Sequence, residues 1–141
     1  MAIWFKEMVL EDVQTRGKGT MLEHLGIEIT GLGDDYIEGT MPVDERTIQP
    51  MGILHGGASL ALAETLGSLA GSYVIDPSKK FCVGLDINGN HIRPVRNGKV
   101  TGRANPIHLG TSTQVWNITI KNDDGQLVCI SRLTMAVLDK K

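Results

Sequence analysis

The chain has 141 residues, which suits one domain with its own core and is too short for two. Hydrophobic residues make up 41% and charged residues 21%, close to the average for globular proteins, and the net charge is −2 with lysines and arginines scattered. These values exclude the basic patch of a nucleic-acid-binding protein and the polybasic strip of a membrane-surface protein. We therefore expect one domain over residues 1–141, with neither nucleic acid nor membrane as a partner.

The N-terminus and the cysteines both favour a cytoplasmic protein. The first seven residues have neither the basic start nor the apolar centre of a secretory signal. Cys82 and Cys129 lie in apolar, strand-like stretches without CxxC or Cys/His spacing, so we expect buried free thiols. The four histidines lack metal-ligand spacing, and we expect no metal and no other cofactor.

The first third of the chain predicts short elements before a loop. The second of two helical turns has Thr20 as its cap and Gly26 as its stop. The strands flank a Gly-Asp-Asp turn. Helical turns are expected at residues 10–16 and 20–25, strands at 27–30 and 36–41, and a loop at 42–54.

Residues 56–71 are the only candidate for a long helix. This stretch is rich in alanine and leucine and contains no proline. Its apolar residues occupy nearly every face, which is typical of a buried helix. Its many small residues allow a sheet to pack closely around it.

The remainder of the chain predicts strand after strand. Asn97-Gly98 is a hairpin signal that opens the second of these strands. In the third, Trp116, Ile118 and Ile120 alternate with polar residues. The expected strands are 81–91, 99–108, 113–121 and 127–138.

One buried helix among antiparallel strands predicts an α+β fold with the sheet wrapped around the helix. One small sheet cannot bury all the apolar faces of such a helix, so we expect a second subunit to cover the remainder, which predicts an oligomer.

Glu64 is the exceptional residue of the predicted helix. It is the only charged residue from Gly56 through Ile75, and leaving a buried carboxylate unpaired is costly. Such groups are enriched at active sites, although a Glu that caps a loop or pairs with an Arg of the sheet would also fit. Ser68 follows four residues later on the same helix face. Its hydroxyl either bonds its own backbone or orients the carboxylate and a water.

The start of the helix is unusual because His55-Gly56-Gly57 offers no common capping side chain. We expect the N–H groups of Gly56, Gly57 and Ala58 to be free for a ligand, and a thioester oxygen that becomes an oxyanion would suit them. A glycine turn that admits close packing is the alternative. Together with Gln49 and His55 as hydrogen-bonding groups and Glu64 as carboxylate, the set suits acyl transfer to water. No Gly-x-Ser-x-Gly elbow and no phosphate-binding loop occurs.

The stretch Gln-Pro-Met-Gly-Ile-Leu-His-Gly-Gly at residues 49–57, followed by Ala63-Glu64 and Gly67-Ser68, resembles the PaaI-like hotdog thioesterases. The resemblance extends over nearly the whole chain. It is strongest to the members that hydrolyse aromatic acyl-CoA thioesters, namely the naphthoyl-CoA thioesterase of menaquinone synthesis and the proofreading thioesterase of enterobactin synthesis. It implies the hotdog fold: a long helix in a curled antiparallel sheet, paired into dimers or dimers of dimers with active sites between subunits.

The resemblance also implies roles for individual residues. Glu64 of one subunit would be the nucleophile or general base, with Ser68 beside it. From the partner, the Gly56 N–H would bind the thioester oxygen, and Gln49 and His55 would position the carbonyl and the water. CoA would follow a path along Gly84, His91, Ile92, Arg93, Pro94, Gly110, Thr111, Ser112, Thr113 and Gln114.

Met51 departs from the Phe that is common at this position in the aromatic-acyl enzymes, so the acyl preference of this protein is expected to differ if Met51 lines the pocket.

The leading hypothesis is hydrolysis of a hydroxylated aryl- or naphthoyl-CoA to the free acid and CoA. The alternatives are proofreading hydrolysis of a mischarged aryl carrier protein, a dehydratase acting on acyl-carrier protein, and a non-catalytic acyl-CoA-binding module. The acyl group, the pathway, and dimer against tetramer stay open.

Overall fold

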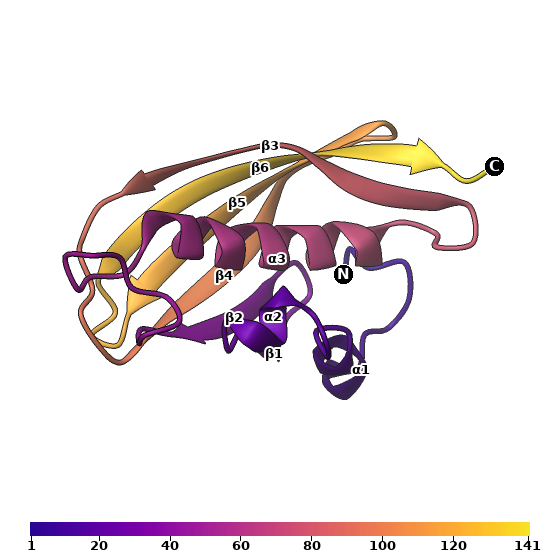
Figure 1. The fold of residues 1–141 in the computed structure, drawn as a ribbon. Helices are drawn as coiled ribbons and strands as arrows, with labels where there is room; N and C mark the ends of the chain where they lie inside the picture. Colours follow the sequence, from indigo (N-terminus) through magenta and orange to yellow (C-terminus); the bar gives the residue numbers. More distant parts are fainter.

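The computed structural model describes residues 1–141 and wraps one six-stranded antiparallel sheet around a long helix (Figure 1). In chain order the elements are α1 (Leu10–Thr15), α2 (Met21–His24), β1 (Glu28–Leu32), β2 (Ile37–Pro42), α3 (Gly56–Val74), β3 (Lys80–His91), β4 (Lys99–Leu109), β5 (Thr113–Asn122) and β6 (Leu127–Asp139). The order across the sheet is β1-β2-β4-β5-β6-β3. The predicted α+β hotdog fold is confirmed.

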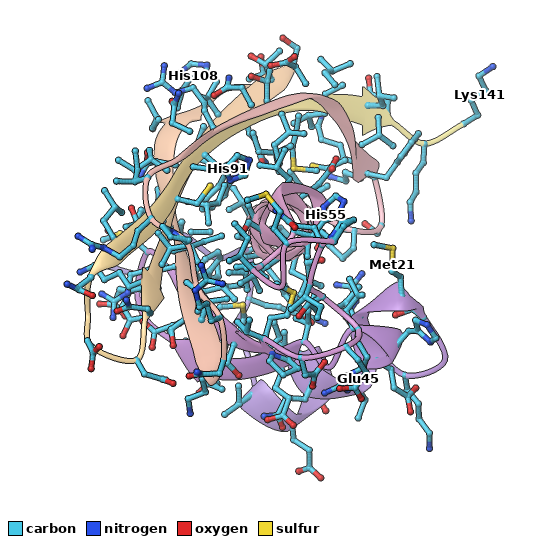
Figure 2. The ribbon with its side chains drawn as sticks, turned by 60° about the vertical axis from the view of Figure 1, so that its left-hand side comes forward. Met21, Glu45, His55, His91, His108 and Lys141 are labelled. Atoms are coloured by element: carbon cyan, nitrogen blue, oxygen red, sulfur yellow. The ribbon has the colours of Figure 1, made fainter.

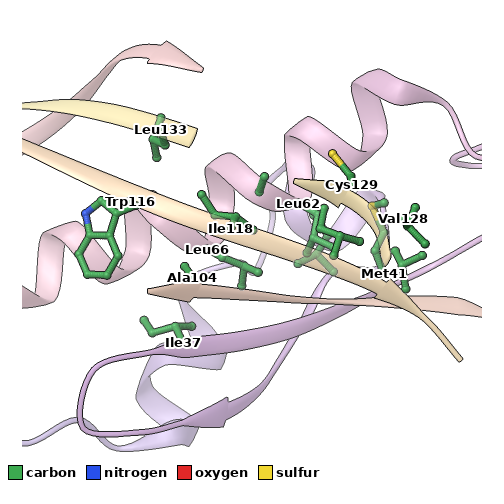
Figure 3. Close-up of a cluster of buried hydrophobic side chains, with 14 of the residues drawn as sticks. Ile37, Met41, Leu62, Leu66, Ala104, Trp116, Ile118, Val128, Cys129 and Leu133 are labelled. Carbon is green, nitrogen blue, oxygen red and sulfur yellow. The ribbon is translucent and has the colours of Figure 1, made fainter. Parts of the chain in front are cut away.

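Small residues let α3 pack against the sheet at close range. A Cβ atom added to Gly102 of β4 would lie 2.8 Å from a methyl group of Leu66 on α3. On the helix side, a Cβ atom at Gly67 would lie 2.6 Å from a methyl group of Leu133 on β6. Glycines on both surfaces therefore admit the leucines of the opposite one. Figure 3 shows Leu66 and Leu133 among the buried side chains of the core. The expected close packing is confirmed.

The alternation predicted for β5 is also confirmed. Gln114, Trp116, Ile118 and Ile120 are buried, while the residues between them are not. Since successive strand residues point to opposite faces, one face of β5 covers α3 and the other faces outward.

The hairpin expected at Asn97-Gly98 is wrong. Gly98 does adopt a positive φ of 76°, but β3 pairs with β6, and β4 lies between β2 and β5. The strands on either side of this turn are thus not neighbours, and the Gly98 carbonyl instead accepts a hydrogen bond of 2.8 Å from the Val43 N–H. The dipeptide fixes a local turn and carries no information on which strands pair.

The two edges of the sheet differ in length and cover. At one edge, β1 has 5 residues, an irregular register between Ile29 and Gly31, and contacts with α1. At the other, β3 has 12 residues and an unpaired side, with Val83 and Leu85 exposed by 41% and 62%. A long bare edge with apolar side chains is a surface that pairs with another strand.

None of the helices combines the length and the hydropathy that a bilayer-spanning helix needs.

Candidate active site

Glu64 lines a cavity of about 570 Å³ along one face of α3, which we call the Glu64 cavity. A Cβ atom at Gly84 would lie 2.6 Å from Glu64 Oε1, so the carboxylate lies against the backbone of β3. The walls are formed by α3, α2 and their neighbours: Arg16, Thr20, Met21, Leu22, Leu25, Ile27, Ala61, Glu64, Thr65, Ser68, Leu69, Ser72 and Cys82.

The half-buried carboxylate of Glu64 has no ionic partner in the chain. The salt bridges all lie elsewhere: Arg46–Asp44, Lys79–Asp76, Lys80–Asp139 and Arg103–Glu38. The alternative that Glu64 pairs with an Arg of the sheet is therefore wrong for the single chain. Ser68 lines the same cavity, so the structure brings its side chain and the carboxylate to one wall.

The start of α3 offers one free donor instead of the three that we expected. His55 is the N-cap, and its Nδ1 accepts a hydrogen bond of 2.8 Å from the Gly57 N–H. The N–H of Ala58 donates to the His55 carbonyl at 3.0 Å. Only the Gly56 N–H in this turn has no acceptor. The expectation failed because histidine is an uncommon N-cap, although its ring nitrogen accepts as a carboxylate or hydroxyl would.

The cap also fixes the tautomer of His55. Because Nδ1 accepts the Gly57 hydrogen, the hydrogen of the neutral ring is on Nε2. His55 is exposed at the start of α3, so this Nε2–H is available as a donor to a bound molecule. In Figure 2, His55 lies at the start of α3 and His91 on the sheet beside it, whereas His108 lies on the outer side of the sheet.

A second cavity of about 420 Å³, the Gly56 cavity, lies around the start of α3. Its walls are Gln49, Ile53, Leu54, Gly56, Ser59, His91, Ile92, Arg93, Pro94 and Val128. A Cβ atom at Gly56 would lie 2.7 Å from His91 Nε2, so this position needs glycine because the imidazole approaches the backbone closely. The Gln49 side-chain oxygen accepts the Met51 N–H. Met51 itself is 76% exposed and lines neither cavity.

The catalytic residues predicted from the sequence thus fall into two groups. Glu64 and Ser68 line one cavity, while Gln49 and Gly56 line the other. Gly56 and Glu64 are eight residues apart on α3, which is about 12 Å along the helix axis. One carbonyl group cannot lie within hydrogen-bonding distance of both in a single chain.

The residues expected to bind CoA are likewise separated within one chain. His91, Ile92, Arg93 and Pro94 lie at the end of β3. Thr113 pairs with Ala136, which pairs with Val83 near the start of β3, eight residues or about 26 Å from His91. The loop of Gly110, Thr111 and Ser112 that precedes Thr113 is therefore at the opposite end of the sheet.

Gln114 does not fit its expected role in CoA binding. It is 1% exposed, its Nε2 donates to the Gly71 carbonyl at 3.3 Å, and its Oε1 accepts from Trp116 Nε1 at 2.9 Å. Both ends of its amide are engaged in the core. Gln114 links β5 to α3. The available sign was that Gln114 stands two residues before Trp116 and so shares the face of Trp116, Ile118 and Ile120.

Sequence reasoning missed the wall that α1 and α2 contribute to the Glu64 cavity. Arg16 and Met21 line it, and neither belongs to a motif that signals a site.

Cys82, expected to be a buried thiol, is half-buried in the same wall, and burial raises the pKa of its thiol above the usual value. No group of three or more His, Cys, Asp or Glu residues is arranged to hold a metal ion.

Comparison with known proteins identifies the family to which the chain belongs. Residues 51–129 match the model of the thioesterase superfamily. The chain is 52% identical over 136 residues to a proofreading thioesterase EntH of Cronobacter turicensis, covering 96% of this chain and 98% of that protein. It is 49% identical over 136 residues to a 1,4-dihydroxy-2-naphthoyl-CoA hydrolase of Escherichia coli, covering 96% and 99%. The crystal structure of thioesterase HI1161 from Haemophilus influenzae shares 55% identity and a TM-score of 0.94, covering 97% of this chain and 95% of that one.

Proposed function

The chain belongs to the thioesterase superfamily and is a thioester hydrolase, and we propose that it hydrolyses aromatic acyl-CoA thioesters at a site shared by two subunits. The observation that carries the proposal is the division of the site. An unpaired carboxylate and a free helix N–H belong to residues about 12 Å apart along α3, and they face separate cavities.

In the proposed reaction Glu64 acts on the thioester carbonyl carbon. As general base it takes a proton from a water that attacks this carbon; as nucleophile it forms an acyl anhydride that water then hydrolyses. In both forms the Gly56 N–H of the partner subunit stabilises the oxyanion, and the carbon–sulfur bond breaks to release CoA, whose sulfur takes up a proton. His55 Nε2–H and the Gln49 amide donate hydrogen bonds to the carbonyl or the water, and Ser68 holds the water beside Glu64.

The edge of β3 supplies a way to form the shared site. Two copies that pair antiparallel along this edge would cover Val83 and Leu85 and continue the sheet. The pairing would also bring the His91 end of one β3 toward the Val83 end of the other, because antiparallel strands run in opposite directions. Arg93 of one subunit and the loop of Gly110 and Thr111 of the other could then contact one CoA molecule. The dimer and this CoA path are both parts of the proposal.

The apolar wall of the Glu64 cavity and the relatives support an aromatic acyl group. Leu22, Leu25 and Leu69 line a space whose volume lies in the usual range for small-molecule sites. One relative is named as a hydrolase of an aromatic acyl-CoA. Because the thioester hydrolase class holds, the reading of the chain as a non-catalytic binding module is set aside.

A thiol-release assay with aromatic and aliphatic CoA thioesters tests the proposal. We expect the aromatic thioesters to have the higher kcat/KM and the Glu64→Ala variant to be inactive on all of them. Equal or better turnover of aliphatic thioesters would refute the acyl assignment, and an active Glu64→Ala variant would refute the mechanism.

A second candidate substrate is an aryl group on a carrier protein, because another relative is named as a proofreading thioesterase. Both thioesters end in the same phosphopantetheine arm, so the Glu64 cavity would receive the same acyl group. Comparing kcat/KM for one aryl group on CoA and on a carrier protein distinguishes the two substrates.

A further inference from the structure

Arg16 brings a positive charge to the Glu64 cavity that the proposed chemistry does not use. The residue follows α1 directly, and its side chain lines the cavity together with Glu64. Its Nη1 donates to Ser72 Oγ at 3.3 Å, and its Cζ lies 5.3 Å from the centre of the Tyr73 ring. Arg16 belongs to none of the salt bridges of the chain.

These contacts leave most of the guanidinium unused. A guanidinium has five N–H donors, and here one makes a long hydrogen bond to an uncharged hydroxyl. Arg16 is exposed and has no carboxylate partner, so its remaining donors are solvated in the free chain and available to a bound group. The Glu64 cavity therefore holds two unpaired charges of opposite sign.

The two charges lie at opposite ends of the cavity. Ser72, to which Arg16 bonds, is eight residues beyond Glu64 on α3, or about 12 Å along the helix axis. Ser68 and Leu69 line the cavity between them, with Leu22 and Leu25 on the other wall. Arg16 also borders a smaller cavity of about 290 Å³ together with Lys6, which places a second cation at the same end.

We propose that Arg16 binds the far end of the acyl group and selects acyl groups that carry a carboxylate or another oxygen acceptor there. The inference rests on the proposed function, because it assumes that the thioester carbon is next to Glu64. From that point an acyl group extends along α3 over the apolar wall, and the guanidinium is the first charged group that its far end meets. A charge-assisted hydrogen bond to an oxygen at this end adds binding energy that a methyl group does not provide.

The test compares two thioesters of similar shape, 4-carboxycinnamoyl-CoA and 4-methylcinnamoyl-CoA. For the wild type we expect a kcat/KM about 10-fold higher for the carboxylate, the size of a net charge-assisted hydrogen bond. Arg16→Met should abolish this preference while hydrolysis of the methyl compound changes little. Arg16→Lys, which keeps the charge and loses the planar fork, should retain part of it. Lys18→Met is the matched control, since it removes an exposed cation two residues away that lines neither cavity, and it should retain the full preference.

The possible failures are distinguishable. If the methyl compound is hydrolysed in a Glu64-dependent way but the carboxylate is not preferred, or Arg16→Met keeps the preference, the inference is wrong and the proposed function stands. If neither compound is hydrolysed, the proposed function fails, and dissociation constants measured in Glu64→Ala decide the inference. Tighter binding of the carboxylate that disappears in Glu64→Ala/Arg16→Met supports it, and equal binding of the two compounds overturns it.

Discussion

The Glu64 cavity and the Gly56 cavity are built on the same helix and yet differ in almost every property. The first is a long space with an apolar wall and one carboxylate, and the second lies at the helix start among a free N–H, His91 and Arg93. We propose that the first receives the acyl group and that the second receives the thioester oxygen and the polar arm of CoA. About 12 Å of helix separates the two sets of groups, so the proposed reaction, which uses both sets, needs a second subunit.

The largest effect is expected from removing the carboxylate that distinguishes the Glu64 cavity. Glu64→Ala should lower kcat by about 10³-fold or more, because Glu64 is the only carboxylate that lines this cavity and is the proposed base or nucleophile. The melting temperature should stay near that of the wild type, since Glu64 has no salt bridge to lose. Glu45→Ala, which removes an exposed carboxylate in the loop before α3, should keep wild-type turnover. Glu64→Ala turnover within a few-fold of the wild type would remove Glu64 from the mechanism.

A smaller effect should follow from moving the carboxylate without deleting it. In Gly84→Ala the new methyl group would lie 2.6 Å from Glu64 Oε1, and it should push the flexible end of the side chain aside. We expect kcat to fall by about 10²-fold, as a displacement of about 1 Å can produce. Gly31→Ala is the control, because its new methyl group would have no neighbour nearer than 3.5 Å. If Gly84→Ala and Gly31→Ala show the same kcat, the position of the carboxylate against β3 does not matter for catalysis.

The start of α3, beside the Gly56 cavity, is best probed at its N-cap His55, whose two ring nitrogens have separate proposed roles. His55→Ala removes the acceptor of the Gly57 N–H and should destabilise the protein by about 1 kcal/mol, as loss of an N-cap does. His55→Asn should restore the cap and the stability, because Asn is a good N-cap, but should leave turnover reduced by about 10-fold or more without the Nε2–H donor. Urea unfolding and steady-state kinetics measure the two effects separately. Recovery of turnover together with stability in His55→Asn would limit His55 to a capping role.

The smallest effect concerns Cys82 in the wall of the Glu64 cavity. Burial raises the pKa of its thiol, so less reactive thiolate is present at any given pH than in an exposed cysteine. In a Cys129→Ser background, alkylation by iodoacetamide should be slow at pH 7 and should continue to accelerate above pH 9. Saturation with the free acid product should slow it further if the acyl group occupies this cavity. Alkylation that levels off near pH 8 would contradict the raised pKa.

Several features of the fold were predictable from short stretches of sequence, because interactions between neighbouring residues determine them. Thr20 does cap α2 through its hydroxyl, and Gly26 ends the turn with a φ of 73°. Glu64 stood out as the one charge in an apolar helix, and the structure leaves it unpaired in a cavity. These signals depend on a few neighbouring residues, and tertiary packing does not override them here.

The features that were predicted wrongly or missed have a different cause, because each depends on contacts between segments far apart in the sequence. The sequence predicts the long helix over residues 56–71, but α3 continues to Val74. Gly71 has no positive φ, and a Cβ atom there would lie 2.5 Å from Gln114 Oε1, so the glycine serves packing and not termination. Arg16 was missed because only the folded chain brings it to Ser72, 56 residues away. No local pattern contains that information.

Subunit complementation tests the shared site most directly. We would mix Glu64→Ala with Gln49→Ala/His55→Ala after dissociating and reassociating the subunits, each variant being nearly inactive alone. If each site takes Glu64 from one subunit and His55 from the other, every mixed dimer has one intact site, and the mixture should regain about one quarter of wild-type turnover. A mixture that stays as inactive as its components, although mixed dimers are present, would contradict a site shared between subunits.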